Sequence, residues 1–389
     1  MPSKPIIFSF FSGSGFLDLG FEMNGFEIVY VNEIHPPFLD AYKYSRKSLN
    51  LPEAKYGYNS DNVAQLTDES TLHKLAELIV DARRSSKLIG FIGGPPCPDF
   101  SIGGKNKGRD GNNGKLSDSY IELIGKLKPD FFLFENVKGL WKTQKHRIFY
   151  EELRRKIQNS GYVTVEKLIN AIEYSVPQNR ERILLLGFNL DTIVGGRSCK
   201  VKSIPDNIFP WNKYKKYTRN EIFELNWPET EPFQIDSEKN CPSEVIEEIT
   251  VEYWFRKNNV YEHPNMGHHF KPKAGLKRFT SVDEGDDSRK SFKRLHRWRY
   301  SPTACYGNNE VHLHPYKSRR ISVSEALAIQ SLPMLYSLPP YMTLSNMFKT
   351  IGNGVPYLMA ESLATLISEI LDSKKITNLL DLSTEFQEI

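Results

Sequence analysis

The chain has 389 residues, 39% of them hydrophobic and 25% charged, and its formal net charge is +4. This composition is typical of a globular protein with one large domain and a smaller second one. No apolar run reaches the roughly 18 residues that a membrane span needs, and the N-terminus does not resemble a signal peptide. These features exclude a membrane-spanning protein and predict an intracellular, cytoplasmic one.

Cysteine and histidine spacing gives no sign of a disulfide framework or a metal site. The cysteines are far apart and lack a CxxC spacing, and no cysteine or acid joins the histidines at a finger-like spacing. The residues concerned are Cys97, Cys199, Cys241, Cys305, His263, His268, His269, His312 and His314. We therefore expect no metal.

In chain order, short apolar runs alternate with helical patterns through the first half. Strands are predicted over Pro5–Phe11, Glu27–Asn32, Leu88–Ile92, Asp130–Phe134, Tyr162–Leu168 and Arg182–Phe188, and helices over Pro37–Ser48, Ser70–Arg84, Ser117–Leu127 and His146–Asn159. This alternation predicts an α/β fold with a doubly wound, mainly parallel sheet.

From about Thr192 to Lys317 the chain is rich in Trp, Tyr, Pro, Lys and His without sustained periodicity, which predicts a smaller, irregular domain. Helical patterns return over Ser322–Ser331 and Val355–Leu371, and the residues after Asp372 are expected to form a frayed tail. The predicted units are residues 1–191 with 318–375 as the first domain, 192–317 as the second, and 376–389 as the tail.

The passage 93–101, GGPPCPDFS, sets Cys97 in a proline-flanked turn directly after the apolar run Leu88–Ile92. In an open α/β sheet, reactive groups lie in the turns that leave buried strands, and glycines beside prolines let the backbone approach a ligand closely. Cys97 is therefore the candidate nucleophile. The alternative is a buried cysteine that packs as a small hydrophobic side chain.

A glycine turn follows the first predicted strand at Phe11–Gly15, and Glu33 follows the second strand. An acid about twenty residues after a glycine turn is typical of nucleotide-binding βαβ units, in which it binds a ribose. Asp18 stands where a dinucleotide fingerprint has its third glycine, so the pattern predicts a nucleoside without a pyrophosphate. A plain β-turn is the alternative.

Two further motifs lie at the ends of apolar strands. Glu135 directly follows the run that ends at Phe134, at the same sheet edge as Cys97, where a carboxyl group can gain a raised pKa and donate a proton or bind a base edge. Its alternative is an acid that starts a helix. Arg180 and Arg182 are two residues apart, so one side of the next strand offers two guanidiniums to carboxylates, phosphates or a base carbonyl.

The stretch from Lys271 to Arg299 holds ten Lys or Arg and four acids, interleaved with aromatic residues. Such a pattern is typical of a surface for nucleic-acid phosphates and bases. The candidate contacts within it are Lys293, Arg294, Arg297 and Arg299. The alternative is a solvated charged face.

Together these motifs resemble the DNA (cytosine-5) methyltransferase family, and they occur in the family's order. The matching motifs are FSGSGFLDLGFE (11–22), VNEIHP (31–36), Asp61 in SDNV, GGPPCPDFS, NNGKL (112–116), FENV (134–137), VPQNRER (176–182), RRISVSEALAIQSLP (319–333) and IGNGVPYLMAESLA (351–364). The unmatched stretch between VPQNRER and RRISV is where that family keeps its variable target-recognition domain.

The resemblance implies a Rossmann-like methyltransferase domain and covalent catalysis. Cys97 would attack carbon 6 of a flipped-out cytosine, so that carbon 5 takes the methyl group of S-adenosylmethionine and S-adenosylhomocysteine is released. Glu135 would hold the amino group and ring nitrogen of the base, Arg182 would contact its carbonyl, and Arg180 would stabilise the attack near the base and phosphate.

Binding residues are also implied by position. The cofactor set is Phe11, Gly13, Ser14 and Gly15 around the methionine part, Glu33 on the ribose, Asp61 and Asn62 on the adenine, and Pro96, Leu116, Asn353 and Val355 to complete the site. The DNA set is Ser101, Lys105, Lys107, Arg109 and Gln178, with Lys293, Arg294, Arg297 and Arg299 from the basic stretch. For segment 103–114 the alternative is an ordinary flexible linker. The cofactor set requires the C-terminal helix to return beside the first strand.

Three positions depart from the family's usual residues. Pro98 stands in place of Gln after the nucleophile, Phe16 in place of a second Gly, and Ser9 in place of the Asp before the glycine turn. None of these removes a catalytic group, but Pro98 puts the DNA contacts of its loop in doubt.

The sequence therefore predicts a monomeric enzyme that methylates carbon 5 of cytosine in a specific double-stranded DNA site. We expect it to act at the bacterial nucleoid in a restriction-modification system with a cognate endonuclease. The alternatives are a tRNA cytosine substrate, an inactive DNA-binding relative and a nucleotide-dependent oxidoreductase. The large unmatched domain argues against the first, the presence of Cys97, Glu135 and both arginines against the second, and the missing third glycine against the last.

Overall fold

The computed structural model describes residues 4–85, 87–96, 112–193, 195, 201–272, 277–304, 306, 310–371 and 373–387. Several residues singled out in the sequence lie outside the described residues: Cys97, Pro98, Ser101, Lys105, Lys107 and Arg109.

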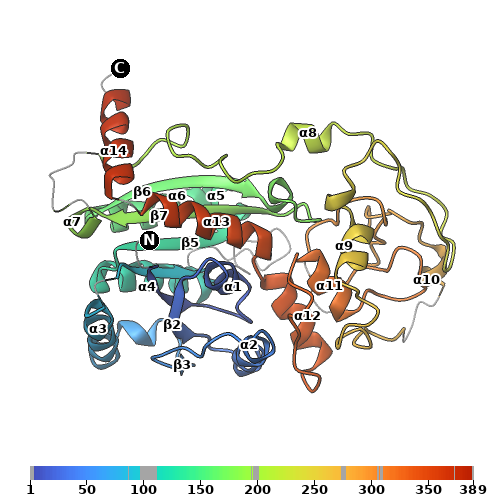
Figure 1. Cartoon of the computed structure of the whole chain (residues 1–389), viewed down its shortest axis with the longest axis horizontal. Coiled ribbons are helices and arrows are strands. Elements are labelled where there is room, and N and C mark those ends of the chain that lie inside the picture. The colour runs from blue at the N-terminus through green and yellow to red at the C-terminus, as the bar shows by residue number, and fades with distance from the viewer. Residues whose placement is uncertain are drawn as a thin grey trace.

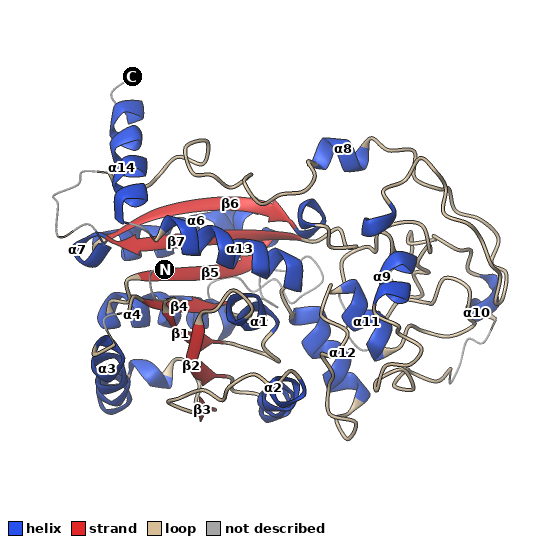
Figure 2. Cartoon of the chain, in the orientation of Figure 1, coloured by secondary structure: helices blue, strands red, loops and turns tan. Residues whose placement is uncertain are grey.

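Within the described residues, seven strands form one sheet in the order β3-β2-β1-β4-β5-β7-β6 (Figure 2). The strands are β1 (Ile6–Phe10), β2 (Glu27–Asn32), β3 (Tyr58–Asn59), β4 (Ile89–Gly93), β5 (Phe131–Val137), β6 (Tyr162–Asn170) and β7 (Glu181–Asn189). Strands β1 to β5 are parallel, whereas β7 runs antiparallel to both β5 and β6. The predicted doubly wound, mainly parallel α/β fold is confirmed.

Helices cover both faces of this sheet (Figure 1). The α-helices are α1 (Phe16–Glu22), α2 (Pro36–Ser48), α3 (Glu69–Arg83), α4 (Asn112–Leu127), α5 (Lys138–Lys142), α6 (Gln144–Asn159), α7 (Leu190–Ile193), α8 (Arg219–Phe223), α9 (Val251–Lys257), α10 (Arg278–Ser281), α11 (Val323–Ile329), α12 (Leu344–Asn353), α13 (Tyr357–Ile370) and α14 (Ser373–Gln387). The 3-10 helices are η1 (Gln65–Thr67), η3 (Ala171–Tyr174) and η4 (Glu247–Ile249).

Alternation along the strands explains this two-sided packing, because successive side chains point to opposite faces. Ile7 of β1 packs in the core cluster that includes residues of α1, α2 and α13. Its neighbours Ile6 and Phe8 pack in the cluster on the other face, which includes residues of α3, α4 and α6. Both clusters consist of buried apolar side chains, so the central strands read as nearly continuous hydrophobic runs.

The predicted strands are all present, but β5 is longer than expected. Residues of β5 pair in antiparallel register with β7 as far as Val137, which lies opposite Arg182. Glu135 therefore lies within the strand, opposite Leu184, and does not follow it as predicted. The β7 partner extends the ladder because it supplies backbone hydrogen-bonding groups beyond the apolar run.

The expected frayed tail after Asp372 is wrong for residues 373–387, which form α14. Ile376 and Leu380 are four residues apart, so they share one face of this helix. Both are buried in the core cluster that contains α13. The helix is therefore held by packing against the main body of the chain.

The region between β7 and α11 is irregular, as the sequence predicted, with the short helices α8, α9 and α10 among its described residues. It lies beside the sheet in Figure 1. A third core cluster joins it to the rest of the chain, because Trp254 and Phe255 of α9 pack in the same cluster as Phe16 and Leu19 of α1. The domain boundaries at residues 192 and 317 stay a prediction. None of the described helices has the length and apolar character needed to cross a membrane.

Candidate active site

The segment after β4 meets the end of β5 at the carboxyl-terminal edge of the parallel strands, which is where an open α/β sheet places its ligands. Gly94, directly after β4, lies so close to Glu135 of β5 that an added Cβ would stand 2.7 Å from Glu135 Oε2. Asn136 Nδ2 donates a hydrogen bond to the Pro95 carbonyl at 3.3 Å. The chain that leads to Cys97 thus starts against the Glu135 carboxylate, and Cys97 itself lies outside the described residues.

Glu135 and Arg182 form a buried ion pair, with 2.8 Å between Arg182 Nε and Glu135 Oε1. Because Arg182 lies opposite Val137, it shares a sheet face with Glu135. Burial raises the pKa of Glu135 above its ordinary value, although Arg182 and Arg180 oppose that effect. The site therefore holds a carboxyl group whose proton is retained to higher pH than usual, beside a fixed positive charge.

Arg180 lies just before β7 and is fully buried. Its Nη2 donates to the Gly352 carbonyl at 2.8 Å and its Nη1 to the Ala304 carbonyl at 3.2 Å. It also lies close enough to Glu135 to lower the pKa of that carboxyl. The guanidinium thus binds two segments from the C-terminal half to the site, and its catalytic role stays a prediction.

Gln178 was expected to contact DNA, and the structure contradicts this. Its side chain is fully buried, its Oε1 accepts the Ala304 N–H at 3.0 Å, and its Nε2 donates to Gln330 Oε1 at 3.3 Å. The amide is satisfied inside the protein. Gln178 therefore positions the chain around Ala304.

Arg294 and Arg297 were also expected to contact DNA, and both are corrected. Each is buried. Arg294 donates to four backbone carbonyls, those of Phe279 at 2.6 Å, Val282 at 2.7 Å, His314 at 2.5 Å and Lys317 at 3.2 Å. Arg297 pairs with buried Glu284, with 2.8 Å from Nε to Oε1. These guanidiniums hold loops of the region between β7 and α11 together and are withdrawn from solvent.

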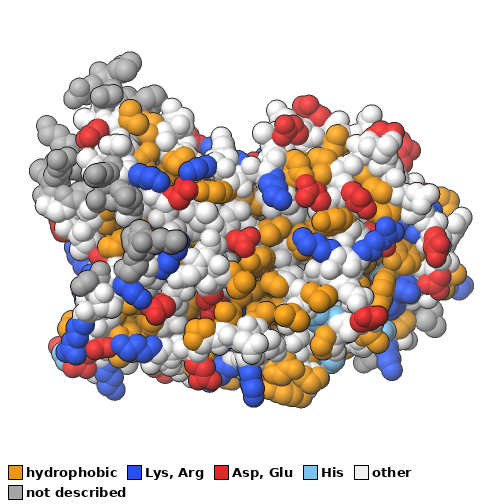
Figure 3. Space-filling view, viewed as in Figure 1, with side chains coloured by type: hydrophobic (Ala, Val, Ile, Leu, Met, Phe, Trp, Pro, Cys, Tyr) orange, Lys and Arg blue, Asp and Glu red, His pale blue; other side chains and the backbone are white. Residues whose placement is uncertain are grey.

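The other two predicted DNA contacts of the basic stretch, Arg299 and Lys293, are less enclosed. Arg299 is partly buried and donates from Nε to the Pro228 carbonyl, so it is engaged within the protein. Lys293 is partly exposed, and its DNA contact stays a prediction. On the face shown in Figure 3, Lys and Arg side chains are interspersed with Asp and Glu. The charge distribution there is mixed, as is common on protein surfaces.

Among the described residues, one group could supply three metal ligands: Glu231, Glu284 and His296. Arg297 already bonds both carboxylate oxygens of Glu284. His296 Nδ1 accepts the Trp298 N–H at 3.0 Å, so the neutral ring carries its proton on Nε2, which lies 3.3 Å from Glu231 Oε1. Burial lowers the pKa of His296 to about 4, which keeps the ring neutral. The group is an internal polar network.

The candidate cofactor site lies at the other end of the same sheet edge, around the glycine turn. Gly13 and Gly15 have φ of 57° and 81°, a left-handed conformation that favours glycine. The Gly13 N–H donates to Glu33 Oε2 and the His35 N–H to Glu33 Oε1, each at 2.8 Å. Burial raises the pKa of Glu33, against these hydrogen bonds and the charge of Lys349. The glycine turn and Glu33, which the sequence placed at neighbouring strand ends, are therefore in direct contact.

The other predicted cofactor residues surround this turn. Asp61 is exposed, and its backbone carbonyl accepts from Asn32 Nδ2 at 2.9 Å. Ile34, which the sequence analysis did not single out, directly follows Glu33 and is 54% exposed. These side chains together fit a nucleoside: Glu33 could accept hydrogen bonds from ribose hydroxyls, Asp61 from an amino group of the base, and Ile34 could pack against the base. Residues with intermediate or greater exposure near this edge also include Phe11, Asn62, Pro96, Leu116 and Asn353, whereas Ser14 and Val355 are buried.

Supports of the glycine turn were also missed by sequence reasoning. Arg46 is buried and donates from Nη2 to the Gly15 carbonyl at 2.7 Å and from Nη1 to the Ser14 carbonyl at 3.2 Å. Tyr336 OH donates to the same Ser14 carbonyl at 2.7 Å. Ser14 Oγ lies 2.7 Å from Thr350 Oγ1 of α12. These contacts join residues distant in sequence, so no local pattern could have identified them.

The departures at positions 9 and 16 have structural explanations. Ser9 Oγ donates to Oδ1 of buried Asp18 at 2.8 Å, whereas an Asp at position 9 would place a second carboxylate there. Phe16 is buried, and its ring lies 5.2 Å from that of Tyr336 in an edge-on arrangement. A Cβ on Gly354 would stand 2.1 Å from Phe16, so the glycine makes room for this ring.

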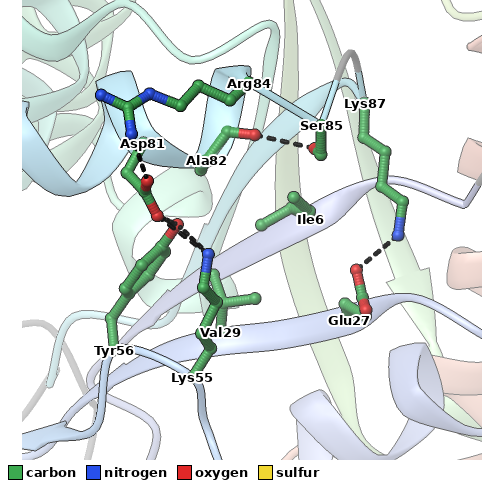
Figure 4. A pocket seen from close by; sticks show the side chains of 10 residues that line it. All are labelled: Ile6, Glu27, Val29, Lys55, Tyr56, Asp81, Ala82, Arg84, Ser85 and Lys87. Carbon is green, nitrogen blue, oxygen red and sulfur yellow. Dashed lines mark hydrogen bonds and ion pairs between the residues drawn. The ribbon is translucent and has the colours of Figure 1, made fainter.

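A cavity of about 380 Å³ lies at the opposite, N-terminal edge of the sheet (Figure 4). Its lining includes Ile6 and Glu27, the first residues of β1 and β2. The charged side chains there pair with one another, as in Lys87–Glu27 at 2.6 Å and Lys55–Asp81 at 2.8 Å. This cavity is separate from the Glu135 and Glu33 sites.

Comparison with known proteins agrees with this architecture. The family described as C-5 cytosine-specific DNA methylase matches residues 6–369. The Neisseria meningitidis protein "Type II methyltransferase M.NmeDI" is 54% identical over 370 residues, covering 95% of this chain and 85% of the relative. The Fusobacterium nucleatum protein "Type II methyltransferase M.FnuDI" is 28% identical over 380 residues, covering 95% and 96%.

Solved structures share the fold. A protein described as a DNA modification methyltransferase encoded within an E. coli prophage has a TM-score of 0.64 at 21% identity, covering 95% of this chain and 100% of its own. The S. pombe Dnmt2 methyltransferase has a TM-score of 0.55 at 14% identity, covering 95% and 98%. From its sequence match, the chain belongs to the C-5 cytosine-specific DNA methylase family.

Proposed function

We propose that the protein transfers the methyl group of S-adenosylmethionine to carbon 5 of a flipped-out cytosine in double-stranded DNA, through a covalent bond from Cys97 to carbon 6. The observation that carries this proposal is the buried Glu135–Arg182 pair, which lies against Gly94 at the start of the passage to Cys97. A carboxyl group with a raised pKa beside a fixed guanidinium suits the edge of a pyrimidine.

The chemistry follows from these groups. The Cys97 thiolate forms a bond to carbon 6, and the electron pair of the carbon 5–carbon 6 double bond forms a double bond between carbons 4 and 5. The pair of the carbon 4–nitrogen 3 double bond moves to nitrogen 3, which takes a proton from Glu135, so carbon 5 becomes an enamine-like nucleophile. Arg182 fixes the carboxyl group through their ion pair and holds the base carbonyl. As carbon 5 takes the methyl group, the ring nitrogen returns its proton to Glu135. A base such as water then removes the proton from carbon 5, the carbon 5–carbon 6 double bond re-forms and the thiolate leaves, so Cys97 is regenerated.

S-adenosylmethionine supplies an electrophilic methyl group and leaves as S-adenosylhomocysteine. Glu33 would hold its ribose, Asp61 and Asn62 its adenine, and the turn at Gly13 its methionine part. Both Glu33 oxygens keep free lone pairs after accepting one backbone N–H each, which is what two ribose hydroxyls require. Exposed Ile34 offers an apolar surface beside them.

Flipping a cytosine out of a duplex costs a few kcal/mol, which phosphate and groove contacts must offset. We assign these contacts to the region between β7 and α11 and to residues 101–109. Two relatives carry names of type II methyltransferases, which supports a role beside a cognate restriction endonuclease.

The test is product analysis with labelled S-adenosylmethionine and either duplex DNA or tRNA. We expect label in DNA as 5-methylcytosine, and none with Cys97→Ser. Label on adenine, on the exocyclic nitrogen of cytosine, or in tRNA alone would refute the proposal.

A further inference from the structure

A row of alternating charges connects the segment after β7 with the ribbon that carries Glu135 and Arg182. Its ion pairs are Lys215–Glu173 at 2.8 Å, Glu173–Arg219 at 3.2 Å, Arg219–Glu181 at 3.0 Å and Glu181–Lys138, which is also in direct contact. Lys215 and Arg219 belong to the connecting segment, residues 201–219. This segment leads into the recognition region, by which we mean the part of the chain from α8 to α11, where DNA contacts are proposed. Figure 1 shows this segment passing along β6 toward α8.

Two members of this row lie at the end of the β5–β7 ladder. Val137 and Arg182 are register partners, and the next residues outward are Lys138, the first residue of α5, and Glu181, the first residue of β7. Glu181 points to the sheet face opposite that of Arg182, because side chains alternate along a strand. The Glu181 carbonyl also accepts from Arg182 Nη1 at 2.8 Å. One residue therefore contacts Arg182 through its backbone and the charge row through its side chain.

Arg219 contacts three other elements of the structure. Its Nη1 bonds Glu181, its Nε bonds Glu173 in η3, and its Nη2 donates to the Leu168 carbonyl of β6 at 3.0 Å. It is the first residue of α8, whose N-terminus is fixed by a capping box between Thr218 and Glu221. The guanidinium thus joins β6, η3 and β7 to the start of α8.

The neighbouring cations favour the charged form of the Glu181 carboxyl group. Burial would raise the pKa of Glu181, but Lys138 and Arg219 outweigh it and hold the pKa below its ordinary value. Glu173 is buried and Glu181 is 17% exposed at its side chain, so these pairs are less screened than ordinary surface ion pairs.

We propose that Arg219 is a positioning residue. Acting through Glu181, it holds the end of the β5–β7 ribbon, and with it the Glu135–Arg182 pair, to the segment that leads into the recognition region. The inference rests on the proposed function, since it assigns a role in placing the groups that hold the cytosine. A displacement of about 1 Å at such groups can cost up to about 100-fold in rate.

The experiment measures the rate at which the full-length protein forms a covalent adduct with duplex DNA containing 5-fluorocytosine. Saturating S-adenosylmethionine and DNA are used. Arg219→Gln and Glu181→Gln should each slow adduct formation about 10-fold. A separate titration of S-adenosylmethionine should give a KM within about twofold of the wild-type value. Because the two residues act as one unit, the double variant should also be slowed about 10-fold and not about 100-fold.

Two further variants distinguish a positioning role of Arg219 from a general loss of contacts between β6 and the connecting segment. Arg219→Lys keeps the charge with fewer donors and should recover part of the lost rate, even if Arg219→Gln folds poorly. Lys167→Gln removes another link between β6 and the connecting segment, the Lys167–Asp206 pair at 2.5 Å, without touching Glu181. It should retain the wild-type rate within about twofold.

Wild-type rates in Arg219→Gln and Glu181→Gln, additive losses in the double variant, or an equal loss in Lys167→Gln would overturn the inference. Each of those results leaves the proposed function standing. A wild-type protein that forms no adduct at all would instead defeat the proposed function.

Discussion

The end of the β5–β7 ribbon and the basic stretch at residues 271–299 both looked functional in the sequence, yet their arginines are used differently. Arg182 pairs with Glu135 at the candidate site, whereas two arginines of the basic stretch are buried within their own region. Glu135 and Arg182 lie at a strand end, against the chain that leads to Cys97. In the basic stretch, Arg294 and Arg297 are enclosed by carbonyls and a carboxylate of their own region. On a strand, the face to which a charged side chain points can be predicted from the alternation of residues. In an irregular loop it cannot, because no such periodicity exists.

Glu135→Gln tests the ribbon end and should have the largest effect. The amide cannot donate and recover a proton, so kcat should fall by about 100- to 10,000-fold, the usual contribution of general acid–base catalysis. Initial rates at saturating DNA and S-adenosylmethionine measure it. The wild-type rate should also decline as pH rises through the raised pKa of Glu135, because the protonated form is the active one.

That pH dependence supplies the control. Glu135→Gln should lack the decline, since no titrating proton remains at this position. A variant with near-normal kcat, or one that keeps the same decline, would show that another group carries the proton.

Arg297→Ala tests the basic stretch, and here the loss should be in stability. Removing the guanidinium leaves Glu284 buried without its ion-pair partner, which costs about 3–5 kcal/mol. Urea unfolding monitored by tryptophan fluorescence measures the change. Lys293→Ala is the matched control, because a partly exposed lysine should alter stability by no more than about 0.5 kcal/mol.

DNA binding would separate the two variants further. Lys293→Ala should weaken binding and reduce the salt dependence by about one phosphate contact. If Arg297→Ala folds with wild-type stability and loses DNA affinity instead, our correction of its role is mistaken.

Asp18 tests the glycine turn, where the expected effect is smaller and depends on pH. Burial raises the pKa of Asp18 to about 6, with Arg46 opposing the shift. The folded state therefore holds this proton more tightly than the unfolded state does. The resulting stabilisation is full below 3.8, the ordinary pKa of an aspartate, and is lost as pH rises through about 6, about 3 kcal/mol in all.

The measurement is the free energy of unfolding of the wild type and of Asp18→Asn between pH 4 and pH 8. The advantage of the wild type should shrink with pH, because the amide does not titrate. A constant difference across this range would contradict a raised pKa at Asp18.

The sequence could predict the sheet because its strands are apolar runs flanked by turn residues, and parallel strands bring their carboxyl ends to one edge. This placed Glu135 beside the Cys97 passage and Glu33 beside the glycine turn. It could not predict that Arg46 and Tyr336 hold Ser14, because those contacts cross more than thirty and three hundred positions respectively. Burial of Arg294 and the order of α14 likewise depend on distant partners.

The central claim is that a sulfur–carbon bond forms between Cys97 and the target base. Mass spectrometry of the protein after incubation with S-adenosylmethionine and a 5-fluorocytosine duplex, followed by proteolysis, tests it most directly. We expect a methylated fluorocytosine nucleotide attached to the peptide that contains Cys97, and no such mass with Cys97→Ser. An adduct on another residue, or methylated DNA released without any adduct, would contradict the account.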